Sequence, residues 1–415
     1  MWWKNAVIYE LYVDKFAGNF TGLTGKLDYL KNLGINCVHI LPHYPSPMVD
    51  DGYDVSDYKG VRAELGTIED FKNFATTAHK EGIKIIVDLV LNHASASHPW
   101  FLEAHRNKNA GTRELFLWSA GGKEFPLAIN VFSQVKPKNW IFNKDTGDYY
   151  FSTFYPDQAD FNWQNPEVLS RFLDIMDFWV SMGADGFRLD AAPYLIKKEG
   201  TDCKGLPEVH EILMKLRSHI DKNYPEVVLL AEVHDTLYKM KEYFDDGVEC
   251  HLTYNFYLNE RMMLAFKRED SSIVDEAVKE CFGIPENTAW ANFLRNHDEI
   301  SMAGLSAEES KEIISKFDPE EKYRFEAYTA MRLASMFKGD REKIINAFQW
   351  LFDTPGAHII YYGDEIGMEN EAVGKGEDMR RTVRGNFDWT KAEIEMNNPS
   401  SLFNAVKKII AQNKK

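Results

Sequence analysis

The chain has 415 residues, of which 44% are hydrophobic and 27% charged, a composition typical of a soluble globular protein. Its formal net charge of −16 disfavours nucleic acid and anionic membrane surfaces as partners. No apolar run is long enough to span a bilayer, and the N-terminal segment MWWKNAVIYELYV lacks the features of a secretory leader. We therefore expect a cytoplasmic protein whose four scattered cysteines are reduced.

Apolar, β-rich segments alternate with helical patterns along almost the whole chain, which favours a parallel sheet with crossover helices. Strands are predicted at 7–13, 37–42, 83–90, 186–190, 227–233, 250–256, 291–296 and 358–363. Helices are predicted at 24–33, 68–81, 166–182, 207–223, 257–281, 323–350 and 401–412. Eight strands followed by helical patterns predict an α/β fold of the closed (β/α)8 type, the TIM barrel, rather than a doubly wound open sheet. No Gly-rich phosphate-binding fingerprint follows any strand, which disfavours a nucleotide-binding protein.

The connection between the third and fourth strands is an exception to this alternation. Residues 94–160 carry no barrel-like βα unit and are rich in Trp, Phe, Tyr, Asn and Gly. Because long structureless loops are uncommon in compact domains, we predict an inserted subdomain on the catalytic face, between strand 3 and helix 3. The predicted parts are the first part of the barrel (1–93), the inserted subdomain (94–160) and the second part of the barrel (161–415), with no further domain after the last helix.

Three carboxylates stand where apolar runs end: Asp190 in GFRLD, Glu232 in VVLLAEV and Asp298 in ANFLRNHD. In a (β/α)8 barrel the C-terminal ends of the strands form the face on which active sites are built. Three carboxylates converging there suit the cleavage of a glycosidic bond, with one nucleophile, one acid/base and one group that holds the sugar. The alternative, three helix caps or salt-bridge partners, is common for a single aspartate but does not account for the set.

The motifs around these carboxylates form an ordered series. DLVLNH (88–93) closes the third strand and is followed along the chain by QADFN (158–162), GFRLD, AEV and RNHD. The series resembles the signature regions of the α-amylase superfamily of retaining glycoside hydrolases and transglycosylases, over roughly residues 5–385. Similarity is highest to trehalose synthases and to the oligo-1,6-glucosidase and α-glucosidase relatives. It is carried by LPHYPSPMVDDGYDVSDY (41–58), GFRLDAAPYL (186–195), EGTDCKGLPEVH (199–210), FLRNHDE (293–299) and YYGDEIGM (361–368).

The resemblance implies a role for each site residue. Asp190 is the expected nucleophile, kept ionised by Arg188, which lies two residues earlier on the same side of the strand. Glu232 is the expected acid/base, with a pKa raised by the apolar run before it, and the two carboxyl groups should lie about 5–5.5 Å apart. Asp298 is expected to bind sugar hydroxyls. The other expected sugar-binding residues are Asp50, Tyr53, His93, Arg188, His297 and Arg381. The insert aromatics Trp100, Phe101, Trp118, Trp140 and Trp163 are expected to form mainly a separate small core, with a glucan-binding wall as the alternative.

The chain departs from the family in four places. The first βα connection lacks the Asp-rich calcium loop, and the RNHD and QADFN variants accompany the metal-free branch; we expect no cofactor and no metal, including at Asn92 and Asp160. Residues 191–194 (AAPY) replace a Lys-His pair that grips longer glucans, which favours short substrates. RRTVRGNFDW (380–389) replaces a segment that usually continues as R-T-P-M-Q-W, and His234 and Asp235 follow AEV. The family's C-terminal β-sandwich is missing, and a homo-oligomer could cover the surface this leaves.

Two activities remain open, and a third hypothesis belongs to another class. The leading one is a retaining hydrolase of the α-amylase or α-glucosidase type that acts on short α-glucosides such as maltose and maltooligosaccharides, through a β-glucosyl-enzyme on Asp190. The alternative is a trehalose synthase, in which water is excluded and the released glucose attacks through another hydroxyl, or another α-glucosyltransferase. A remote alternative is an inactive sugar-binding or scaffold barrel, which would need none of the carboxylates. Water exclusion decides between the first two, and the sequence does not reveal it.

Overall fold

The computed structural model describes residues 1–413 and contains a closed barrel of parallel strands, which confirms the predicted (β/α)8 fold. Its strands are β1 (Val7–Leu11), β2 (Cys37–Ile40), β3 (Lys84–Val90), β9 (Gly186–Asp190), β10 (Val228–Ala231), β11 (Leu252–Tyr254), β12 (Ala289–Phe293) and β15 (Ala357–Tyr361). β15 pairs with β1 and closes the ring. Nearly every strand residue is buried, as expected for parallel strands covered by helices.

The helices around the barrel fall mostly where the sequence predicts them. α6 (Pro166–Met182) and α7 (Pro207–Asn223) have the predicted ranges. Asn165 caps α6, Pro166 is its first residue, and Gly183 ends it in the left-handed region at φ 110°. The other helices are α1 (Val13–Ala17), α2 (Phe20–Thr24), α3 (Leu27–Leu33), α4 (Ile68–Lys80), α8 (Leu237–Glu242), α9 (Phe256–Arg268), α10 (Ser272–Glu280), α14 (Trp389–Asn397) and α15 (Leu402–Asn413).

The predicted helix 323–350 is wrong over its first half. The chain there forms a hairpin of β13 (Arg324–Phe325) and β14 (Tyr328–Thr329), followed by α12 (Leu333–Met336) and α13 (Arg341–Phe352). Glu326 at φ 47° and Gly339 at φ 73° reverse the chain in conformations that a continuous helix does not allow. With α11 (Ala307–Phe317), the hairpin makes residues 294–340 a second long excursion from the barrel.

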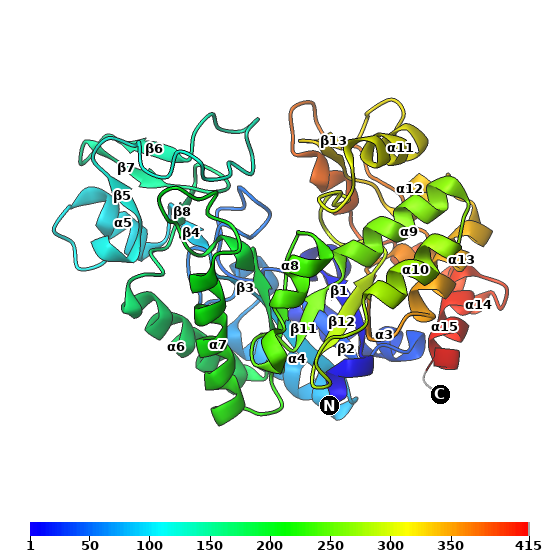
Figure 1. Cartoon of the computed structure of the whole chain (residues 1–415). Helices are drawn as coiled ribbons and strands as arrows, with labels where there is room; N and C mark the ends of the chain where they lie inside the picture. Colours follow the sequence, from blue (N-terminus) through cyan, green and yellow to red (C-terminus); the bar gives the residue numbers. More distant parts are fainter. Residues whose placement is uncertain (414–415) are drawn as a thin grey trace.

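Residues 93–160 form small antiparallel sheets and a helix between β3 and α6. β4 (His93–Ser95) pairs with β8 (Gln158–Asp160), while β7 (Asp148–Phe151) lies between β5 (Trp118–Ser119) and β6 (Trp140–Asn143), and α5 (Pro99–Arg106) precedes them. Figure 1 shows this insert, in cyan and teal, and the yellow α11–β13 segment at the same end of the barrel, with both chain termini at the other end. The exact boundaries of the insert remain a prediction. Within residues 1–413 no helix is both long and apolar enough to cross a membrane.

Candidate active site

Arg188 links the two carboxylates expected to perform the reaction. Asp190 is the last residue of β9, and Glu232 directly follows β10, the neighbouring strand. Nη1 of Arg188 donates to Asp190 Oδ1 at 2.7 Å, and its Nη2 lies 2.8 Å from Glu232 Oε2. Nη1 also donates to Oδ1 of Asp88 on β3 at 2.7 Å. Because a guanidinium is rigid and planar, this one buried side chain fixes both carboxylates relative to each other.

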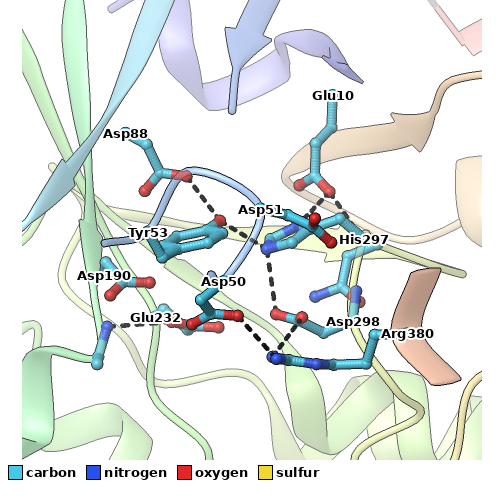
Figure 2. Close-up of polar contacts among 12 residues, drawn as sticks. Glu10, Asp50, Asp51, Tyr53, Asp88, Asp190, Glu232, His297, Asp298 and Arg380 are labelled. Atoms are coloured by element: carbon cyan, nitrogen blue, oxygen red, sulfur yellow. Dashed lines mark hydrogen bonds and ion pairs between the residues drawn. The ribbon is translucent and has the colours of Figure 1, made fainter. Parts of the chain in front are cut away.

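Asp298 lies in the loop after β12 rather than at the tip of the strand, and arginines hold it there. Its Oδ1 accepts from Arg384 Nη2 at 2.6 Å and from Arg380 Nη1 at 3.3 Å. Arg380 Nη2 also donates to Asp50 Oδ1 at 2.8 Å. Figure 2 shows Asp50 and Asp298 converging on Arg380. These carboxylates are therefore oriented before any sugar binds, which suits groups that grip hydroxyls.

Tyr53 and His297 lie side by side and connect Asp298 to the interior of the barrel. Their rings stack with centroids 5.4 Å apart, and the Tyr53 hydroxyl lies 2.6 Å from His297 Nε2 and 2.9 Å from Asp88 Oδ2. His297 Nδ1 lies 2.9 Å from Oε1 of Glu10 on β1, and its Nε2 lies 3.1 Å from Asp298 (Figure 2). Glu10 was not predicted as a site residue, although a lone carboxylate inside the buried strand VIYEL was the available signal.

Neighbouring buried charges strongly shift the pKa values of His297 and Asp298. Burial alone lowers the pKa of His297, but the charges of Asp298 and Glu10 outweigh it and raise that pKa to about 9. Burial raises the pKa of Asp298, but His297, Arg384 and Arg380 hold it well below its usual value. At neutral pH the site therefore contains a buried imidazolium beside an ionised Asp298.

The pKa order of Asp190 and Glu232 is the reverse of the one expected from the sequence. Burial and the charge of Glu232 raise the pKa of Asp190 well above its usual value against the attraction of Arg188. Burial also raises the pKa of Glu232, but Arg188 and His234 outweigh it and lower that pKa to about 2. The cause is the number of donors: Glu232 accepts from Arg188, His234 and the Ala191 amide, whereas Asp190 accepts from Arg188. The pKa of Asp190 is therefore raised while that of Glu232 is lowered, because Glu232 has the larger number of donors.

Arg380, rather than the predicted Arg381, is the arginine that lines the cavity. Arg381 Nε binds Asp51 at 3.2 Å and does not line the cavity, whereas Arg380 does. Both lie in the 3-10 turn Met379–Val383, in which successive side chains point about 120° apart, so only one of them faces the sugar site. Arg384, which was not predicted, binds Asp51 Oδ2 at 2.7 Å in addition to Asp298.

His93 and Asp50 complete the set predicted to bind sugar. Burial lowers the pKa of His93 to about 4, so the ring is neutral at pH 7; its Nε2 lies 3.2 Å from the Tyr53 carbonyl oxygen. Asp50 accepts from Gln158 Nε2 at 3.0 Å as well as from Arg380. Tyr53, His93 and Asp50 all line one cavity together with the three carboxylates.

That cavity encloses about 350 Å³, within the range of small-ligand sites. Beyond the carboxylates its wall includes Phe132, Phe154, Tyr194, Lys204, His234, Glu299 and Tyr328. None of the insert aromatics singled out from the sequence lines it, so the alternative considered for them, a glucan-binding wall, is not found at this cavity. Phe101 and Trp118 instead pack on one another inside the insert, with centroids 5.7 Å apart.

The insert and the β13–β14 hairpin meet next to Arg380, at the edge of this cavity, and form what we call the roof: Phe132, Ser133, Gln134, Phe325 and Glu326. The rings of Phe132 and Phe325 have centroids 5.5 Å apart, and the Arg380 guanidinium lies 4.9 Å from one and 4.5 Å from the other. Glu326 accepts from the Gln134 amide at 3.0 Å and from Ser133 Oγ at 3.3 Å. Two excursions from the barrel, almost two hundred residues apart in the chain, thus close over Arg380.

A lysine lies between Asn92 and Asp160, the two residues at which the sequence predicts that no metal binds. The ammonium of Lys197 lies 2.7 Å from Asp160 Oδ2 and 3.0 Å from Asn92 Oδ1, and it donates to the Tyr194 carbonyl oxygen. Its side chain is buried, so a fixed positive charge fills the cage formed by these three oxygens. Within residues 1–413 no cluster of three or more His, Cys, Asp or Glu side chains is arranged to hold a metal ion.

Comparison with known proteins places this barrel in a family. Residues 12–415 match the family described as alpha amylase, catalytic domain. The chain is 40% identical over 403 residues to the trehalose synthase of Thermus thermophilus, covering 95% of this chain but only 41% of that protein. It is 38% identical to the trehalose synthase/amylase of Mycolicibacterium smegmatis, covering 94% of this chain and 67% of that protein. The crystal structure of an alpha-amylase from H. orenii superposes with a TM-score of 0.79 at 27% identity, over 99% of this chain and 82% of that one. The chain belongs to the α-amylase family and is an enzyme of that superfamily.

Proposed function

We propose that the protein isomerises short α-glucosides, converting maltose into trehalose, rather than hydrolysing them as the sequence favoured. The observation that carries this proposal is the roof, which joins the insert to the β13–β14 hairpin at the edge of the cavity. Because this contact narrows the access to the cavity beside Arg380, we expect it to limit the entry of water to the glucosyl-enzyme and to retain the released glucose for a second attack. The similarity to trehalose synthases over almost the whole chain supports the same conclusion.

The proposed chemistry proceeds in two displacements on the site described above. Glu232 gives a proton to the glycosidic oxygen as Asp190 attacks the anomeric carbon, forming a β-glucosyl ester and releasing glucose. That glucose turns within the cavity, and its anomeric hydroxyl attacks the anomeric carbon (C1) of the glucosyl ester. The C1–O bond to Asp190 breaks, the proton of the attacking hydroxyl returns to Glu232, and the products are trehalose and the free Asp190 carboxylate. Asp298, Asp50 and Arg380 hold the glucosyl hydroxyls.

Three residues orient the ring during both steps. Tyr53 offers an aromatic face to the glucosyl ring, His93 lines the cavity beside it, and His297 holds Tyr53 and Asp298 in place. Arg188 holds the carboxyl groups of Asp190 and Glu232 in fixed positions relative to each other during both steps. No metal takes part in this scheme.

The test is an incubation of the purified protein with maltose and added ¹³C-labelled free glucose, with products followed by NMR. Unlabelled trehalose that accumulates ahead of glucose supports intramolecular isomerisation. Labelled trehalose would mean transfer to external glucose, and glucose alone would mean hydrolysis. Asp190→Asn is the control and should be inactive. If the Asp190→Asn variant still turns over maltose, the nucleophile must be another residue. Absence of turnover on maltose, isomaltose and maltooligosaccharides would favour a binding barrel.

A further inference from the structure

His234 lies against the carboxylate proposed as the acid/base. Its Nε2 is 3.2 Å from Glu232 Oε1, and its ring packs on Phe256 at the start of α9, with centroids 3.6 Å apart. The backbone oxygen of His234 accepts from Lys204 Nζ at 2.5 Å. Packing on one side and backbone anchoring on the other hold the imidazole in this orientation, at the wall of the cavity.

The two oxygens of Glu232 have different surroundings. Oε2 lies 2.8 Å from Arg188 Nη2 and accepts from the Ala191 amide at 3.1 Å. Both partners are donors only, so a proton on Oε2 would face two N–H groups. Oε1 has His234 Nε2 as its partner, and imidazole nitrogen can either donate or accept. The proton that Glu232 delivers therefore resides on Oε1, next to His234.

We infer that His234 is a positioning residue that shares the catalytic proton with Glu232, so that Nε2 supplies the proton that Oε1 passes to the glycosidic oxygen. This inference rests on the acid/base role proposed for Glu232. The steps balance: an imidazolium and a carboxylate become a neutral imidazole and a carboxylic acid. The acid then protonates the leaving oxygen, which keeps the electron pair of the broken C1–O bond. In the second displacement the attacking hydroxyl returns its proton to Oε1, and Nε2 recovers it.

Glu232 needs a neighbouring proton donor because the charges around it lower its pKa. Arg188 and the hydrogen bond from His234 lower the pKa of Glu232 to about 2, even though burial raises it, so this carboxyl does not hold a proton of its own at neutral pH. Asp190 must be ionised to attack, so it cannot act as the proton donor in the same step. Among the groups of residues 1–413 that contact Glu232, Arg188 and the Ala191 amide only donate hydrogen bonds, whereas the ring nitrogen of His234 can donate or accept one.

Charged groups from several elements face His234. Glu260 on α9 and Glu299 in the loop after β12 both interact electrostatically with it, in addition to Glu232. Burial raises the pKa of Glu260 to about 7, so its charge varies in the same pH range. Lys204, from the β9–α7 connection, is offset by Asp235 at 3.0 Å. The surrounding carboxyls are thus placed to stabilise positive charge on the imidazole.

The test compares two donors that differ in their need for a proton. Maltose has a poor leaving group that must be protonated, whereas the fluoride of α-glucosyl fluoride leaves without an acid. His234→Gln keeps a hydrogen-bond donor but lacks a ring nitrogen that can pass a proton to Oε1. It should lower kcat/KM for maltose roughly tenfold or more, leave kcat/KM for α-glucosyl fluoride within about twofold, and change the pH profile for maltose only. His210→Gln is the matched control, because His210 pairs with Glu249 at 2.9 Å away from the cavity.

Glu232→Gln separates failure of this inference from failure of the proposed function. It should lower kcat/KM for maltose by about 10²–10⁴ while fluoride turnover to the glucosyl-enzyme persists. If Glu232→Gln impairs both donors equally, the acid/base assignment fails and the proposed function with it. If Glu232→Gln discriminates between the donors and His234→Gln does not, only the role of His234 is overturned. Equal loss on both donors in His234→Gln would mean a purely structural role and would also overturn it.

Discussion

At the scale of single residues, the charges around His297 depend on one another. The imidazole lies between Glu10, 2.9 Å from Nδ1, and Asp298, 3.1 Å from Nε2, and all three side chains are largely or fully buried. A buried charge is tolerated only when it is paired and hydrogen-bonded, and here each carboxylate satisfies one side of the ring. The same ion group that orients Asp298 at the cavity therefore also contributes to the stability of the fold.

We predict that this contribution disappears at alkaline pH. The folded pKa of His297 is about 9, above the usual value of about 6.5 that it takes when unfolded. Because the folded pKa is raised, protonated His297 contributes fully to the free energy of unfolding below pH 6.5. This contribution declines as pH rises through 9, and its total size is about 3 kcal/mol. Thermal unfolding of the wild type and of His297→Asn at a series of pH values measures it. The difference in Tm should narrow between pH 6.5 and 9.5, and a constant difference would contradict the assignment.

Lys197 supplies a second prediction. Its replacement by Met keeps the length of the side chain but leaves the buried carboxylate of Asp160 without its cation. Breaking such a pair costs about 3–5 kcal/mol, so Tm should fall by several degrees. Because Asn92, Asp160 and the Tyr194 carbonyl still offer three oxygens, millimolar Ca²⁺ should recover part of the loss in the variant and have no effect on the wild type.

Lys198→Met is the matched control for this change. Lys198 is the next residue, is exposed, and pairs with Glu208 on the surface, where such pairs contribute at most about 1 kcal/mol. An equal fall in Tm for both variants would show that the ammonium of Lys197 does not stabilise the cage.

At the scale of elements, local patterns were sufficient for the barrel and insufficient for its excursions. GFRLD became β9 without a change of bounds, and the capped, amphipathic patterns of α6 and α7 were equally clear. The predicted helix 257–281 is divided into α9 and α10 at Glu269, which has a left-handed φ of 56°. The hydrophobic periodicity of the sequence does not indicate this break. Six of the predicted site residues line the cavity, and each lies in a short contiguous signature: Asp50, Tyr53, His93, Asp190, Glu232 and Asp298. Glu10, Arg384, Lys197 and Glu326 could not be predicted, since their roles depend on contacts between segments distant in the chain.

The roof supplies the prediction at this scale. Glu326→Gln keeps the shape of the hairpin tip but weakens its hydrogen bonds to Ser133 and Gln134, because a charged acceptor is replaced by a neutral one. Loosening of the roof should admit water, so the ratio of glucose to trehalose formed from maltose should rise by roughly threefold to tenfold, as expected for the loss of about 1 kcal/mol of hydrogen bonding. Product ratios by chromatography measure it. Glu320→Gln, on the same excursion but exposed, is the control and should leave the ratio unchanged.

At the scale of the whole molecule, the insert and the barrel share one core. Rings form a continuous path from Phe101 on α5 to Phe116, then to Phe161 and on to Phe172 on α6, with successive centroids 5.1, 5.2 and 5.4 Å apart. The separate small core expected for the insert is therefore wrong. The physical reason is that Phe161 directly follows β8, where the chain returns to the barrel, and so contributes to both parts.

A shared core predicts that the insert and the barrel unfold together. Calorimetry should show one transition with equal calorimetric and van't Hoff enthalpies, and circular dichroism and tryptophan fluorescence should report the same Tm. Phe161→Ala removes the link between the two parts and should cost about 3–5 kcal/mol, whereas Phe142→Ala, whose side chain is exposed on β6, should stay within about 0.5 kcal/mol. An early transition confined to the insert in the wild type would mean that the two parts are independent. In that case the roof would open without the barrel, and exclusion of water from the glucosyl-enzyme would lose its structural support.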